Sequence, residues 1–157
     1  MGHGFEPVAG VGRFLSGTPG VLGAVAVQEG VRVVAEAGIA RLRAKGMRLT
    51  ELAVTLADAW LAEYGFTLGS PRDLEGRGSH IALRRGYAAT VGQSLIERAG
   101  VVPDFRCPDR VRLGLAPITT RFVDVWDAMD RLRNLVSGGL SRLAFRNSPP
   151  RAARIRS

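Results

Sequence analysis

The 157-residue chain is poor in the residues that build disulfides and metal sites. Cys107 is its only cysteine, which excludes an intrachain disulfide and a cysteine-based metal cluster. Its two histidines, His3 and His80, stand far apart, and no ligand spacing surrounds either of them. We therefore expect no metal site, and the unpaired thiol fits the reducing conditions of the cytoplasm.

Lysine and long apolar runs are also scarce. Lys45 is the only lysine among 22 basic residues, the others being arginine. The longest apolar-leaning uncharged run, residues 14–28, contains three glycines and a proline. It falls short of the roughly 18 to 20 residues that a membrane span needs, and no small-residue cleavage site follows it. We expect neither a membrane anchor nor a secretory signal.

Acidic residues are absent after Asp130, whereas seven arginines follow it. These arginines account for all but +1 of the net charge of +8, so the basicity belongs to the end of the chain. A nucleic-acid-binding protein acting through this arginine tail remains an alternative. It would need base-stacking aromatics or a recognition helix, and the sequence offers neither. Nucleic acid is therefore not the partner that we expect.

Hydrophobic periodicity predicts four helices and four short strands. Gly38, Gly65 and Gly100 are expected to end the first three helices, and the apolar composition of the first helix predicts that it is buried. The mixed order and the few strands predict an α+β fold, a two-layer α/β sandwich in which helices cover a small sheet. The expected helices span 21–36, 39–64, 87–99 and 121–137, and the expected strands span 66–69, 81–84, 101–106 and 111–115.

Three parts of the chain differ in composition. Residues 1–20 contain six glycines and two prolines and predict a leading segment without regular structure. Residues 21–137 carry the periodic pattern and predict one domain. Residues 138–157 combine arginines with Pro149-Pro150 and keep no helical period, which predicts a basic, disordered tail.

Arg112 is the residue whose position most favours a binding role. In the expected strand, Val111, Leu113 and Leu115 point to one face, and Arg112 and Gly114 point to the other. A glycine two residues along leaves space beside a guanidinium that could grip a carboxylate with two parallel hydrogen bonds. On this pattern alone, an exposed arginine in an ion pair is the favoured interpretation.

Several stretches, taken in order, resemble kynureninases. The order and approximate spacing of these stretches match that family from about residue 1 to residue 137. They are 13–19 (RFLSGTP), 42–45 (LRAK) leading to 49–50 (LT), 70–73 (SPRD), 77–84 (RGSHIALR), 103–106 (PDFR), 112–117 (RLGLAP) and 121–126 (RFVDVW).

The resemblance implies the small C-terminal domain of a type I pyridoxal-phosphate-dependent enzyme. Such an enzyme is a cytoplasmic homodimer that hydrolyses L-kynurenine or 3-hydroxykynurenine, in tryptophan catabolism and NAD biosynthesis. The family's pattern implies that Arg112 binds the substrate carboxylate, which reverses the interpretation from the strand pattern. It also implies that Thr18 lines the phosphate site of pyridoxal 5'-phosphate across the dimer.

The family's Schiff-base lysine and most of its cofactor contacts have no counterpart in this sequence. Lys45 lies among arginines on the polar side of a helix, where we expect a solvated face. We therefore expect a truncated fragment without catalytic residues and inactive alone. The alternative is a small subunit that complements a separately encoded large domain.

Overall fold

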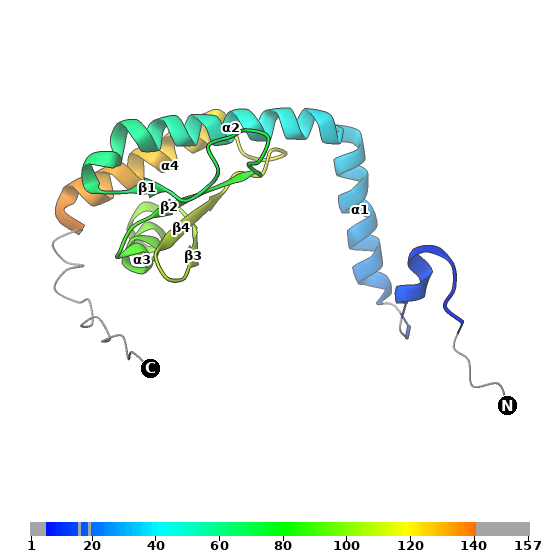
Figure 1. The fold of residues 1–157 in the computed structure, drawn as a ribbon. Coiled ribbons are helices and arrows are strands. Elements are labelled where there is room, and N and C mark those ends of the chain that lie inside the picture. The colour runs from blue at the N-terminus through cyan, green and yellow to red at the C-terminus, as the bar shows by residue number, and fades with distance from the viewer. Residues whose placement is uncertain (1–5, 16, 19, 141–157) are drawn as a thin grey trace, which may run out of the picture. The chain divides into compact units, whose positions relative to one another are not determined.

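A computed structural model describes residues 6–15, 17–18 and 20–140 of the chain. It contains two compact units, Met1–Ile39 and Ala40–Ser157 (Figure 1). The placement of the two units relative to one another is not determined. The expected tail, 138–157, lies outside the described residues except for its first three positions, which belong to η3 (Val136–Leu140).

The first unit contains the 3₁₀-helix η1 (Gly10–Phe14) and the helix α1 (Val21–Ala37). α1 forms where the sequence predicts a helix, and Gly38, at φ +80°, ends it as expected. However, none of the α1 residues is buried, and Leu22 is 87% exposed. The prediction of a helix was correct, but the expectation that it is buried was wrong.

The helices of the second unit also match the sequence pattern closely. Gly65 and Gly100, at φ +76° and +62°, adopt the left-handed conformation that ends a helix without the steric penalty of a Cβ atom. The second expected helix ends as an α-helix at Trp60 and continues as a short 3₁₀ turn. The elements are α2 (Ile39–Trp60), η2 (Ala62–Tyr64), α3 (Ala88–Ala99) and α4 (Phe122–Leu135).

Four short strands form one antiparallel sheet in the order β1-β2-β4-β3. Ile81 of β2 pairs with Leu113 of β4, and Leu83 pairs with Val111. All four of these side chains are buried, so one face of the sheet is apolar, as the alternation predicts. The strands are β1 (Thr67–Leu68), β2 (His80–Arg84), β3 (Asp104–Arg106) and β4 (Arg110–Gly114).

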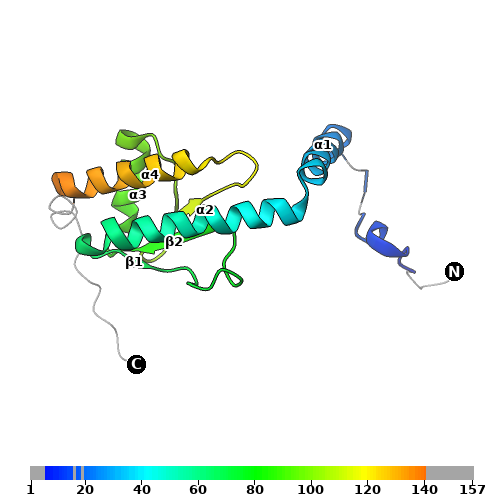
Figure 2. The same cartoon turned by 90° about the horizontal axis from the view of Figure 1, so that it is seen from above.

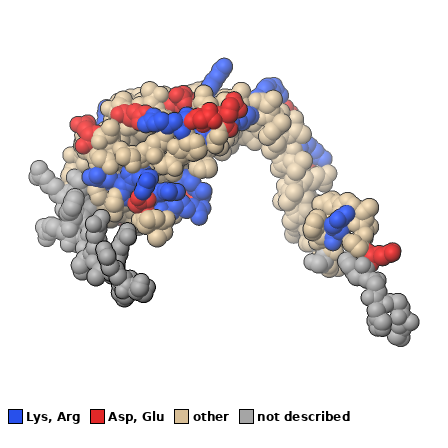
Figure 3. Space-filling view, in the orientation of Figure 1, with Lys and Arg blue, Asp and Glu red and all other residues tan. Residues whose placement is uncertain are grey.

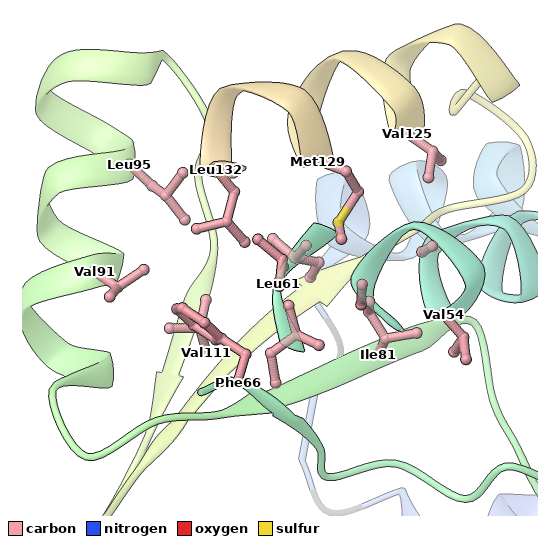
Figure 4. Packing of buried hydrophobic residues seen from close by; sticks show 14 of the residues in the cluster. Val54, Leu61, Phe66, Ile81, Val91, Leu95, Val111, Val125, Met129 and Leu132 are labelled. Atoms are coloured by element: carbon pink, nitrogen blue, oxygen red, sulfur yellow. The ribbon is translucent and has the colours of Figure 1, made fainter. Parts of the chain in front are cut away.

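Helices α2, α3 and α4 bury their apolar sides against this face. Figure 4 shows the side chains of Leu61, just past the end of α2, Leu95 of α3, Met129 of α4 and Val111 of β4 pointing toward one another. Figure 2 shows α4 beside α2, where the Trp60 and Trp126 rings meet edge to face with centroids 5.8 Å apart. The second unit is thus the expected α+β two-layer sandwich.

None of the described helices is both long enough and apolar enough to cross a membrane.

Candidate functional site

Arg112 lies on the face of the sheet opposite the core. Its neighbours Val111 and Leu113 are buried, whereas the Arg112 side chain is 34% exposed. A Cβ atom added to Gly114 would meet no atom within 4 Å, so the space beside Arg112 on this face is open. The alternation read from the sequence is therefore correct for β4. The strand holds the guanidinium at an accessible, polar face.

Asp104 is the acceptor that Arg112 meets across the hairpin. The two residues are direct partners in the pairing of β3 with β4, and Nη2 of Arg112 donates to Oδ2 of Asp104. Nη2 of Arg106 lies 2.7 Å from the same oxygen. Two guanidinium groups therefore share one carboxylate on this face.

The two neighbouring guanidinium groups affect the pKa of the Asp104 carboxyl. Burial raises its pKa, whereas the hydrogen bond from Arg112 and the charges of Arg106 and Arg112 lower it. The net effect is a pKa below the usual value for an aspartate. The carboxyl is thus ionised at neutral pH, and each of its ion pairs is between full charges.

Arginine outnumbers aspartate on this outer face. Arg84 Nη2 lies 3.0 Å from Asp109 Oδ2, and Arg110 Nε lies 3.8 Å from Asp109 Oδ1. With Arg106 and Arg112 at Asp104, four arginines face two aspartates. Figure 3 shows basic side chains gathered over the β3–β4 hairpin, with an acidic group among them. The excess positive charge favours a carboxylate ligand over a cation.

Thr18 belongs to the first unit and is exposed. It follows Gly17, whose φ of +91° is a conformation that other residues rarely adopt. Its hydroxyl can offer one hydrogen bond to a ligand phosphate. Arg112 belongs to the second unit, whose placement relative to Thr18 is not determined.

Neither Lys45 nor His80 belongs to the ion-paired cluster of Asp104, Arg106 and Arg112. Lys45 is half-buried on α2, more covered than the solvated face that the helix pattern predicts. Hydrogen bonds from Arg121 lower the pKa of Asp124, and the charge of Lys45 adds to this effect. His80 is exposed at the end of β2, opposite Gly114. No group of metal-binding side chains occurs among the described residues.

A largely apolar hollow lies elsewhere in the second unit, between the end of β4 and α4. Val101, Leu113, Thr120 and Met129 contribute to its lining, and Arg112 does not. This hollow could not be predicted from local sequence patterns, because its walls come from segments far apart in the chain.

Asp104 also belongs to the candidate site, although it was not predicted from the sequence. The signal was present, because Arg106 and Arg110 are symmetric about Pro108 and a tight hairpin around that residue pairs Asp104 with Arg112. Assigning the two strands without their register concealed the pair.

Comparison with known proteins shows which family this chain is similar to. The family model described as the kynureninase C-terminal domain matches residues 42–132. Kynureninases of Geobacillus thermodenitrificans and Burkholderia mallei are 35% and 38% identical to this chain over 87% of its length. That of Pseudomonas fluorescens is 36% identical over 84% of the chain. The chain spans 32% of the length of each of these relatives.

Proposed function

The chain belongs to the kynureninase family, and from that premise we propose that it provides the substrate-carboxylate site of a kynureninase. The reaction is the hydrolysis of L-kynurenine, or of 3-hydroxykynurenine, to L-alanine and an anthranilate. Pyridoxal 5'-phosphate, when bound, supplies the electron sink for this chemistry. The second unit contributes recognition of the amino-acid end of the substrate.

The observation that carries this proposal is the setting of Arg112. A strand interior fixes its backbone, its guanidinium is one-third exposed, and the missing side chain at Gly114 leaves room for a ligand. A planar guanidinium can donate two parallel hydrogen bonds to a carboxylate, which fixes the orientation of the ligand as well as its position. Arg112 therefore orients the substrate and needs no change in its own protonation.

Thr18 is the residue of this chain that we propose for the cofactor. An exposed hydroxyl after a left-handed glycine fits one hydrogen bond to the phosphate. The fit is partial, since a phosphate carries about two negative charges and needs several donors. We propose that the other contacts, and the lysine that binds the cofactor, belong to the portion of the family's length that this chain does not span. We further propose a dimer in which Thr18 reaches the site of the other subunit.

We propose accordingly that the chain is a truncated fragment and is inactive by itself. The division into a leading segment 1–20, a domain 21–137 and a tail 138–157 is retained as part of this proposal. The alternative within it is a small subunit that works with a separately encoded large domain. Both versions assign the same role to Arg112.

The test uses a chimera that adds the part of the kynureninase length that this chain does not span. The complete 157-residue chain is joined to the preceding two-thirds of the Geobacillus thermodenitrificans kynureninase, and anthranilate fluorescence reports turnover of kynurenine. The chain alone should give no turnover, and the chimera should be active. Turnover by the chain alone that Lys45→Ala abolishes would overturn the proposal that the chain is inactive by itself.

In the chimera, Arg112→Lys should lower kcat/KM by one to two orders of magnitude, roughly 1.4 to 2.7 kcal/mol. Lysine keeps the charge but loses the planar fork. Arg110→Lys is the matched control, because Arg110 lies on the same strand and the same face. Equal kinetics for Arg112→Lys and Arg110→Lys would refute the assignment of Arg112.

A further inference from the structure

Asp104, on the open face of the sheet, forms ion pairs with two guanidinium groups at once. We propose that Asp104 is a positioning residue, which holds the Arg112 guanidinium in the orientation that receives the substrate carboxylate. This inference rests on the proposed function, in which Arg112 binds that carboxylate. The positioning role of Asp104 is inferred from the geometry of the β3–β4 hairpin and not from the family comparison.

The backbone fixes the contact between the two side chains. Asp104 and Arg112 are direct cross-strand partners, and side chains at such positions lie about 5 Å apart at Cβ. Nη2 of Arg112 donates to Oδ2 of Asp104, so one end of the guanidinium is anchored. Nε, Nη1 and the second N–H of Nη2 carry the remaining donors of the planar group. Anchoring one nitrogen therefore orients the others without using them.

The net charge of the cluster around Asp104 favours the binding of one further carboxylate. Arg106 and Arg112 both lie against Oδ2 of Asp104, so this cluster of three side chains carries a net charge of +1. A substrate carboxylate would bring the cluster to neutrality. With an uncharged residue at position 104, the cluster would carry +2, and Arg112 would lose its anchor.

Anchoring also lowers the entropic cost of binding. A free arginine side chain loses rotamer entropy when a ligand immobilises it. In this structure Asp104 already restricts Arg112, whose side chain is 34% exposed and would otherwise sample more rotamers. A pre-oriented binding group improves affinity for the substrate more than the rate of the chemical steps. The expected signature is a change in KM.

The first experiment uses the complete 157-residue chain and needs no activity. The NMR signal of the Arg112 Nε–H group reports how firmly the guanidinium is held. Asp104→Asn should broaden or shift this signal while the amide spectrum of the fold is retained, since the Asp104 side chain is 45% exposed. Asp109→Asn is the matched control, because it removes the other aspartate of this face, which pairs with Arg84. An Arg112 signal that is unchanged in Asp104→Asn would overturn the proposal.

The second experiment is a double-mutant cycle in the chimera. Asp104→Asn should raise KM about tenfold with kcat within about twofold, and Asp104→Glu should recover part of the loss. If Asp104 acts through Arg112, adding Asp104→Asn to Arg112→Lys should change KM little further. Additive effects of the two substitutions would overturn the positioning role.

The two proposals fail in different ways. If Arg112→Lys leaves the kinetics unchanged, the proposed carboxylate site is wrong. If Arg112→Lys raises KM but Asp104→Asn does not, the carboxylate site stands and the positioning role of Asp104 is wrong.

Discussion

The stability of the second unit should depend strongly on one buried arginine, Arg77, in the loop between β1 and β2. Its side chain is 1% exposed. Nη2 lies 2.5 Å from Oε2 of Glu51 and Nε lies 3.2 Å from the Thr50 hydroxyl, both on α2. Nη1 donates to the carbonyl oxygens of Pro71 and Arg72 at 3.1 and 3.2 Å. Arg77 thus ties its own loop to the helix.

Replacing Arg77 with methionine keeps much of the volume and removes all four hydrogen bonds. Each bond is worth about 1 kcal/mol net, and those of a charged donor somewhat more. Glu51 is 53% exposed, so water can replace its lost partner, and we discount that ion pair. The sum is about 3 to 4 kcal/mol, which would lower Tm by roughly 10 °C in a protein of this size. Arg77→Lys should cost about half as much, because an ammonium cannot reach all the acceptors.

Urea unfolding of the complete chain, followed by circular dichroism, measures these changes. Arg72→Met is the matched control. Arg72 also pairs with a carboxylate of α2, Asp58, at 2.7 Å, but its side chain is 66% exposed. Such a pair contributes below about 1 kcal/mol. If Arg77→Met and Arg72→Met destabilise the protein equally, the reasoning from buried hydrogen bonds is refuted.

Two further predictions concern packing and pH. Gly46→Ala should destabilise the protein by about 1 kcal/mol in urea unfolding, although alanine favours helices, because the added Cβ would lie 2.8 Å from the Ser79 hydroxyl oxygen. Gly92→Ala in α3, where the nearest such atom lies 3.8 Å away, should be neutral or stabilising, and the opposite order would contradict the packing argument. Hydrogen bonds from Arg121 hold the pKa of Asp124 below its ordinary value of 3.8, so the stability that this carboxylate contributes is complete above about pH 4 and is lost as the pH falls through the lowered pKa. The stability difference between the wild type and Asp124→Asn should therefore shrink between pH 6 and pH 2, and a constant difference would contradict the linkage.

The local pattern of the sequence was sufficient for most of the elements. Gly65 and Gly100 mark the ends of their helices because only glycine adopts positive φ without strain. The alternation around Arg112 separated the core face of β4 from its open face, because the side chains of a strand point alternately to its two sides. The α+β class followed from the order of the elements, and the matching stretches identified the family.

Burial was less predictable than secondary structure. The composition of α1 suggested a buried helix, yet none of its residues is buried. An apolar sequence shows that burial would be favourable, but whether a partner surface is present depends on other segments. Lys45 shows the opposite case, since it is half-buried where the helix pattern predicted a solvated position. Neither outcome is encoded in the local period.

The sequence by itself determined which residues share a face and where the chain changes direction, because steric preferences act between near neighbours. Only the tertiary structure decided which charges meet. Asp104 and Arg106 share the Arg112 cluster because of the hairpin register, and Arg77 reaches Thr50 across 27 positions of the chain. Such contacts depend on the packing of whole elements, because a hydrogen bond requires donor and acceptor to lie within a few tenths of an ångström of their ideal separation.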